Sequence, residues 1–259
     1  MIRKILYNVL AFVLLLYAVC FAEQNVGNEY PYIQFLGAAQ SIGGSAIFID
    51  TGETKFLIDY GLYYDKEEQQ KNLIIPDKLS KLNFVLLTHA HIDHSGRLPM
   101  LYKNGFRGPV VGTDATKDIT GRMLDMSLSI AENQGTNLFN RSDLNRMLEF
   151  FKTAEYGQIV KLSPDVDVRF SDAGHILGSS IIEIWIKKGD KKLKLVTSGD
   201  MGGKNIPILR DRTQISDADY VVIESTYGDM AKGPINYKPF ETDIKETLKR
   251  GGSVLIPAF

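Results

Sequence analysis

Three imidazoles and one carboxylate lie within six residues of the chain, at His89, His91, Asp93 and His94. A single histidine is more often structural than functional, but four ligand-type side chains at this spacing indicate a metal site. His89 and His91 follow a predicted strand in extended chain, so their side chains project to the same side. Asp93 and His94 lie beyond a turn, from which they can address a second ion.

Two further segments place a ligand-type side chain beside glycine at the end of a predicted strand. His175, the only other histidine of the chain, follows Gly174, and Asp200 follows Gly199. Taken alone, a histidine or aspartate flanked by glycine is more often part of a turn than a metal ligand. Because the histidine cluster is also present, we expect both His175 and Asp200 to be ligands.

The cluster resembles the signature of the metallo-β-lactamase-fold hydrolases, His-x-His-x-Asp-His. Other segments resemble the β-CASP branch of these hydrolases, which contains RNA-processing nucleases. Among them are the endonuclease subunit of the cleavage and polyadenylation specificity factor and its prokaryotic relatives. The resemblance covers roughly residues 30 to 259. The segments that carry it are Asp114–Asp118, Ala173–Ser179, Ser198–Gly202, Glu224–Gly228 and Gly251–Phe259.

The resemblance implies a zinc-dependent hydrolase that cleaves RNA. Two Zn²⁺ ions about 3.5–4 Å apart would lower the pKa of a shared water, which attacks phosphorus as hydroxide. Asp59 would orient an imidazole, with the capping of a turn as an equal alternative. The implied catalytic residues are Asp93, Asp200 and Glu224, the last supporting a histidine that protonates the leaving oxygen. The implied zinc ligands are His89, His91 and His175 for one ion and Asp93 and His94 for the other, with Asp200 bridging the two.

Two histidines that the family pattern requires are missing from the sequence. No histidine follows His175, whereas the pattern needs one as general acid and one to complete the second zinc site. We expect both to lie beyond Phe259, in a longer nuclease of which these residues form the N-terminal portion. The chain itself is therefore expected to hold at most one well-formed zinc ion and to cleave RNA poorly.

Two other functions fit parts of the sequence. A small-molecule hydrolase of the same fold, such as a thioesterase, lactonase or β-lactamase, closes its site with a nearby histidine and carries no β-CASP insertion. A non-catalytic binding subunit usually loses ligands, and the missing downstream histidines are the only support for this alternative. The ligands present in the sequence are His89, His91, Asp93, His94, His175 and Asp200. RNA or another single-stranded nucleic acid is the expected partner, and a homodimer is left open. The net charge of −1 means that RNA binding must depend on a local basic groove.

The resemblance also implies the fold that positions these residues. Hydrophobic residues make up 44% and charged residues 24% of the 259-residue chain, which suits a globular protein with a substantial core. We expect an αββα sandwich, with metals where the strand ends of two packed sheets converge, at residues 23–228. The beginning of a β-CASP domain follows at 229–259. The predicted strands are Tyr32–Leu36, Ala46–Asp50, Phe56–Asp59, Asn83–Thr88, Pro109–Gly112, Val166–Phe170, Ile181–Ile186, Lys192–Thr197, Tyr220–Glu224 and Ser253–Ile256.

Three amphipathic helices are predicted from apolar residues at helical spacing, and the apolar stripes of the first two are expected to pack in the core. The lysine-rich stretch Lys187–Lys194 is expected to form a solvated hairpin turn rather than a nucleic-acid patch. The stripes are Ile119, Met123, Met126 and Ile130 after a Thr113 cap, Leu144, Met147, Leu148 and Phe151 after a Ser142 cap, and Phe240, Ile244 and Leu248 before Gly251.

The first 22 residues predict an export signal. Arg3 and Lys4 precede an apolar run, and Cys20 and Ala22 supply the small residues of a cleavage site. The run is also about long enough for an uncleaved membrane anchor. The protein is therefore expected to be periplasmic or extracellular, or anchored to a membrane through residues 1–22. A misassigned start codon would instead leave it in the cytoplasm.

Overall fold

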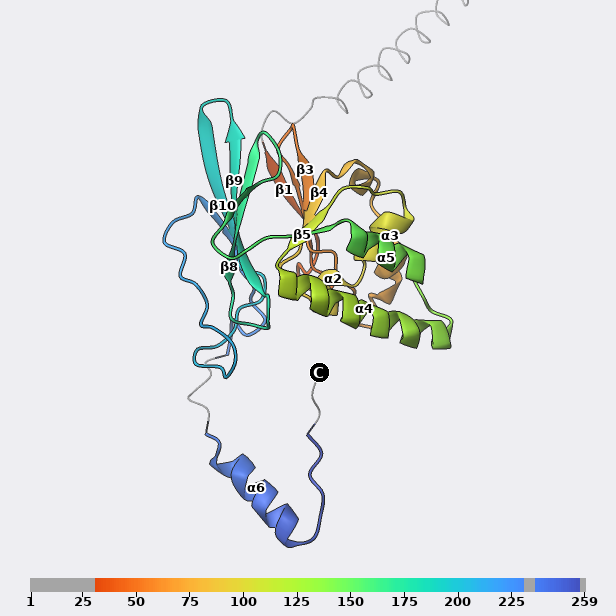
Figure 1. Ribbon diagram of the computed structural model, residues 1–259, viewed down its shortest axis with the longest axis vertical. Coiled ribbons are helices and arrows are strands. Elements are labelled where there is room, and N and C mark those ends of the chain that lie inside the picture. Colours follow the sequence, from red (N-terminus) through yellow and green to blue (C-terminus); the bar gives the residue numbers. More distant parts are fainter. Residues whose placement is uncertain (1–30, 231–235, 257–259) are drawn as a thin grey trace, which may run out of the picture. The chain divides into compact units, whose positions relative to one another are not determined.

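The computed structural model describes residues 31–230 and 236–256, so the predicted export signal lies outside the described residues. The chain divides into two compact units, Met1–Glu224 and Ser225–Phe259. In the first unit, two β-sheets pack face to face and helices cover the outer face of one sheet (Figure 1). Among the described residues, no helix is long and apolar enough to cross a membrane.

The first sheet contains six strands in the order β1-β2-β3-β4-β5-β6. The first three strands pair antiparallel, and β3 to β6 pair parallel. Parallel neighbours end at the same edge of a sheet, so the residues that follow β3 and β4 lie side by side there. The strands are β1 (Tyr32–Gly37), β2 (Ala46–Asp50), β3 (Lys55–Ile58), β4 (Phe84–Leu86), β5 (Val110–Gly112) and β6 (Phe151–Thr153).

The second sheet contains five strands in the order β11-β10-β9-β8-β7. β9 runs antiparallel to both β8 and β10, and β11 runs parallel to β10. The ends of β8, β10 and β11 therefore meet at one edge, where the residues expected to bind metal begin. The strands are β7 (Ile159–Lys161), β8 (Val166–Asp172), β9 (Ser180–Lys188), β10 (Lys191–Thr197) and β11 (Tyr220–Val222).

Alternate residues of the first sheet contribute to two hydrophobic cores, as the period of two in a strand requires. Phe56 and Leu86 pack in the core between the two sheets. Leu57 and Val85 pack in the core between the first sheet and its helices. The helices of this layer are α2 (Ile92–Ser95), α3 (Leu98–Lys103), α4 (Asp114–Gln134) and α5 (Arg141–Glu149), and the short 3₁₀ helices η2 (Gln69–Leu73) and η3 (Asp77–Lys81) connect β3 to β4.

The other face of the second sheet is built around a buried carboxylate. Glu183 is fully buried in β9 and receives hydrogen bonds of 2.7 and 2.8 Å from the guanidinium of Arg169. The ammonium of Lys194 lies 2.8 Å from the same carboxylate. These partners explain how β9 stays buried on both faces, as predicted, although its pattern is not wholly apolar. The predicted hairpin turn is confirmed between β9 and β10, at residues 189–190. Lys194, which was expected to be solvated, is instead buried because it pairs with Glu183.

Helix α4 buries a different face from the predicted one. Its N-cap is Thr113 as expected, and the hydroxyl of Thr113 accepts a hydrogen bond from the backbone N–H of Thr116. However, Met126 and Ile130 are 62% and 51% exposed, so the predicted apolar stripe was wrong. Hydrophobic spacing failed here because threonine counts as polar although its methyl group packs well. The buried positions are Thr116, Thr120, Leu124 and Leu128.

Helix α5 begins at a different cap from the predicted Ser142. Asn140 caps the helix, because its side chain accepts a hydrogen bond from the N–H of Asp143 while the Asp143 carboxylate accepts from the N–H of Asn140, both at 3.0 Å. Asn and Asp three residues apart can form this reciprocal box in the way that Ser and Glu do. Phe151, predicted as the end of this helix, instead begins β6.

The second unit contains helix α6 (Lys238–Lys249), which confirms the predicted helix. The buried strand predicted at Ser253–Ile256 was wrong, since these residues form no strand and Leu255 is 91% exposed. A strand needs a hydrogen-bonded neighbour, and the described residues of this unit supply none. The beginning of a β-CASP domain at 229–259 stays a prediction.

Candidate metal centre

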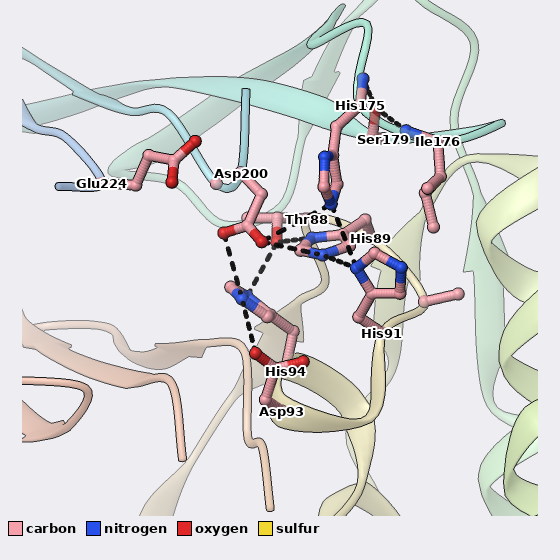
Figure 2. Close-up of polar contacts among 12 residues, drawn as sticks. Thr88, His89, His91, Asp93, His94, His175, Ile176, Ser179, Asp200 and Glu224 are labelled. Atoms are coloured by element: carbon pink, nitrogen blue, oxygen red, sulfur yellow. Dashed lines mark hydrogen bonds and ion pairs between the residues drawn. The ribbon is translucent and has the colours of Figure 1, made fainter. Parts of the chain in front are cut away.

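The side chains expected to form the site converge where strands of both sheets end (Figure 2). In the first sheet, Asp59 follows β3 and the histidine cluster from His89 follows β4. In the second sheet, His175 follows β8, Asp200 follows β10 and Glu224 follows β11. The topology therefore brings together residues that are up to 165 positions apart in the sequence.

Four donor atoms lie within 4.8 Å of one another, and they belong to His89, His91, His175 and Asp200. The Nε2 atoms of His89 and His175 lie 3.0 and 3.1 Å from Nδ1 of His91. The same two atoms lie 3.6 and 3.5 Å from Oδ2 of Asp200. A tetrahedral ion with metal–ligand distances of about 2.0–2.1 Å has donor–donor edges of about 3.3–3.4 Å. The four distances are close to these edges, so the four residues can hold one divalent ion.

A second group of donors shares Asp200 with the first. Oδ1 of Asp200 lies 3.2 Å from Nε2 of His94, and Oδ2 of Asp93 lies 3.9 Å from the same nitrogen. Asp200 thus presents one oxygen to each group, which is the arrangement of a bridging carboxylate. The second group has three donors among the described residues, one fewer than the first.

Asp59 accepts hydrogen bonds from an imidazole and from the backbone of the segment that follows β4. Its Oδ2 accepts a hydrogen bond of 2.7 Å from Nδ1 of His94. Its Oδ1 accepts a hydrogen bond of 2.8 Å from the backbone N–H of Thr88. The backbone of Asp59 has a φ of 60°, a left-handed conformation that aspartate tolerates better than most residues.

The charges of the site favour a bound cation. Burial, together with neighbouring imidazoles, lowers the pKa of His89 well below its usual value, and burial also lowers the pKa of His91. Both are therefore neutral near pH 7, which is the form that binds metal. Burial alone would lower the pKa of His94, but the Asp59 and Asp200 carboxylates outweigh it and raise that pKa to about 10. Two carboxylates that hold a proton so firmly create a position suited to positive charge.

Two glycines permit the loops of the site to approach each other. A Cβ atom on Gly202 would lie 1.5 Å from the carbonyl oxygen of Gly174, and the N–H of Gly202 donates to the carbonyl of Ala173 at 2.9 Å. In the same way, a Cβ atom on Gly61 would lie 1.5 Å from the carbonyl oxygen of Asp93. The glycines beside the ligands are therefore required by close backbone contact.

Sequence reasoning missed two hydroxyl residues that hold the ligand loops. The Ser179 hydroxyl accepts hydrogen bonds of 3.0 and 3.2 Å from the N–H groups of His175 and Ile176, which fixes the His175 loop (Figure 2). The Thr88 hydroxyl lies 3.0 Å from Nδ1 of His89. Their only sequence signal is position, since Thr88 directly precedes the cluster and Ser179 ends the glycine-flanked loop.

Glu224 holds the loop that carries Asp200. Its carboxylate accepts a hydrogen bond of 2.6 Å from the backbone N–H of Met201, and its own N–H donates to the Ser198 hydroxyl at 3.0 Å. Within the described residues, Glu224 thus acts on the position of a neighbouring ligand. Its support of a histidine general acid stays a prediction.

The fold and the site define a class of protein in which a two-sheet sandwich carries a His/Asp metal centre at its strand ends. Residues 48–197 match the family described as the metallo-beta-lactamase superfamily domain. The chain therefore belongs to the metallo-β-lactamase superfamily, as its motifs predicted.

Curated relatives show which members of the superfamily this chain resembles in sequence. The chain is 35% identical over 225 residues to ribonuclease TTHA0252 from Thermus thermophilus, which covers 86% of this chain and 50% of that protein. It is 31% identical over 242 residues to the transcription termination factor FttA from Methanothermobacter thermautotrophicus, covering 90% of this chain and 38% of that protein. The chain thus spans half or less of the length of these relatives. Among solved structures, it is similar to the metallo-beta-lactamase fold protein YhfI from Bacillus subtilis, with a TM-score of 0.43, 18% identity and coverage of 68% and 65% of the two chains.

Proposed function

We propose that this site hydrolyses phosphodiester bonds of RNA with the help of two zinc ions. The observation that carries the proposal is the tetrahedron of three imidazole nitrogens and one carboxylate oxygen, with the second oxygen of Asp200 directed at His94. RNA as the substrate is supported by two relatives, a ribonuclease and a transcription termination factor.

Zinc is the metal that this donor set favours. Imidazole nitrogens and carboxylate oxygens in tetrahedral positions suit Zn²⁺, whereas Mg²⁺ and Ca²⁺ prefer oxygen ligands in larger numbers. When bound, such ions supply Lewis-acid activation of water and of the phosphoryl oxygen. The proposed ligands are His89, His91 and His175 for the first ion and Asp93 and His94 for the second, with Asp200 shared by both.

The remaining residues position these ligands. Asp59 holds the ring of His94 through Nδ1, which leaves Nε2 directed at Asp200. Glu224 fixes the loop after Asp200. Because the first group has four donors and the second has three, we expect one zinc ion to bind more tightly than the other.

Metal analysis after dialysis tests the site. We expect wild-type protein to retain zinc, and His89→Ala and Asp200→Asn to lose the tightly bound ion because each removes one corner of the tetrahedron. Asp118→Asn, on the exposed face of α4, is the matched control and should retain zinc like the wild type. Unchanged zinc content in His89→Ala would overturn the metal proposal.

Cleavage of labelled single-stranded RNA tests the substrate. We expect slow, zinc-dependent cleavage that disappears on addition of EDTA and in His89→Ala. Cleavage that survives both changes would refute the assignment to this site. If the protein hydrolyses a thioester or lactone but does not cleave RNA, the substrate is a small molecule and the assignment of RNA is wrong.

The cellular location is proposed from the basic and apolar composition of residues 1–22. We expect the full chain, expressed with a C-terminal tag in a bacterial host, to be found in the periplasm or the membrane fraction. A variant lacking residues 1–22 should stay in the cytoplasm. Equal distribution of the two proteins would contradict export.

A further inference from the structure

Thr88 occupies a rigid position between the two sheets. It is 1% exposed, and its carbonyl oxygen accepts a hydrogen bond of 2.9 Å from the N–H of Ser180 at the start of β9. Its N–H donates to Oδ1 of Asp59 at 2.8 Å. Its side chain packs against Gly199, where an added Cβ would lie 2.9 Å from Cβ of Thr88. With its backbone held on both sides, Thr88 has little freedom to place its hydroxyl elsewhere.

The hydroxyl of Thr88 lies between a carboxylate and an imidazole. Its Oγ1 is 2.8 Å from Oδ2 of Asp59 and 3.0 Å from Nδ1 of His89. A hydroxyl has one proton, and an ionised carboxylate can only accept a hydrogen bond. The hydroxyl proton therefore points to Asp59, and Oγ1 must accept the proton of Nδ1 from His89. This arrangement leaves the lone pair of His89 on Nε2.

The position of that lone pair matters for the tetrahedron of donors. Nε2 of His89 is the atom that lies 3.0 Å from Nδ1 of His91 and 3.6 Å from Oδ2 of Asp200. In the other tautomer, a proton on Nε2 would point into this space and oppose a bound cation. His89 is fully buried, so water cannot supply an alternative partner for Nδ1.

We propose that Thr88 is a positioning residue that fixes the tautomer of His89 for metal binding. Through it, the single carboxylate of Asp59 orients one imidazole of each donor group, His94 directly and His89 by way of the Thr88 hydroxyl. The inference rests on the metal site of the proposed function, but it does not depend on the substrate. Hydrogen-bond partners behind metal ligands typically change metal affinity by about 10–100-fold, which sets the size of the expected effect.

Zinc affinity measured by competition with a chromophoric chelator tests the inference. Thr88→Val removes the hydroxyl with little change of shape and should weaken the tighter zinc site about 10–100-fold. Thr88→Ser keeps the hydroxyl and should bind zinc within a few-fold of the wild type. Thr120→Val is the matched control, because Thr120 is another fully buried threonine whose hydroxyl has no hydrogen-bond partner among the described residues. Its zinc affinity should stay at the wild-type value.

A direct measurement of the His89 tautomer complements the measurement of zinc affinity. Nitrogen-15 NMR of the metal-free wild-type protein should show His89 protonated on Nδ1. Protonation on Nε2, or an unchanged zinc affinity in folded Thr88→Val, would overturn the inference. If Thr88→Val does not fold, the role of Thr88 is tested by the wild-type spectrum and by the zinc affinity of Thr88→Ser. If His89→Ala retains zinc, the metal site itself fails, whereas loss of zinc in His89→Ala but not in Thr88→Val refutes only the role of Thr88.

Discussion

Gly202→Ala is expected to separate the two loops of the second sheet that carry metal ligands. The new methyl group would lie 1.5 Å from the carbonyl oxygen of Gly174 and 2.8 Å from the backbone nitrogen of His175. Both contacts are with backbone, so no side chain can rotate to relieve them. Since Cβ atoms essentially never approach another atom within 3.0 Å, the loops must move apart by about 1.5 Å, taking van der Waals repulsion as the limit.

This displacement is large compared with what a metal site tolerates. Oδ2 of Asp200 now lies 3.5 Å from Nε2 of His175, close to the edge of a tetrahedral site. Metal–ligand distances must stay within about 0.2 Å of their ideal values. Asp200 would then no longer complete the tetrahedron, and we expect zinc affinity to fall at least about 10–100-fold. That loss corresponds to about 1.4–2.8 kcal/mol.

A chelator competition assay measures the loss, and thermal unfolding in EDTA reports whether the variant is folded. Gly203→Ala is the matched control, because a methyl group there would meet only the side chain of Ile206, at 3.4 Å from Cδ1 and 3.7 Å from Cγ1, which are ordinary contacts. We expect Gly203→Ala to bind zinc like the wild type. Wild-type zinc affinity in Gly202→Ala would refute the reasoning that these loops are held in register by close backbone contact.

Three further variants test, by urea unfolding, contacts that stabilise the fold. Asp165→Ala should lower the free energy of unfolding by about 1–3 kcal/mol, because three neighbouring hydroxyl groups donate to this carboxylate. Burial alone would raise the pKa of Asp165, but those hydrogen bonds outweigh it and lower the pKa. The contribution of Asp165 is therefore present above the unfolded-state pKa of about 3.9 and is lost as pH falls through the lower folded-state pKa, so the difference between variant and wild type should shrink in acid. A difference that grows in acid would contradict this. Glu183→Gln should cost about 3 kcal/mol, the lower end for a buried ion pair, because the Arg169 side chain is 35% exposed. Asn140→Ala should cost about 1 kcal/mol through loss of the α5 capping box, and an unchanged stability would exclude that role.

The site could be predicted in outline because its main signal is local. His89, His91 and His94 lie in one segment, so their spacing alone indicates a shared metal centre. His175 and Asp200 carry a weaker signal, and they became informative only beside that cluster. The strands that end at these residues were also predicted, since each is a short apolar run bounded by turn residues. The two-sheet sandwich was predicted from the resemblance of these motifs to the metallo-β-lactamase fold.

The residues behind the ligands could not be predicted in the same way. The hydrogen bonds of Thr88 to Asp59 span 29 residues of sequence and depend on the parallel pairing of β3 and β4. The buried face of α4 was missed because Thr116 and Thr120 look polar, although both are fully buried. The strand expected after α6 was wrong because apolar composition does not supply a neighbour to pair with.

The proposed first ion would draw its ligands from both sheets. His89 and His91 come from the first sheet, whereas His175 and Asp200 come from the second. A bound ion would then act as a cross-link through the sandwich, and its binding free energy would add to the stability of the fold. At a free zinc concentration 100 times the dissociation constant, this linkage amounts to about 2.7 kcal/mol. The cellular supply of metal would thereby govern the lifetime of the folded protein as well as the state of its site.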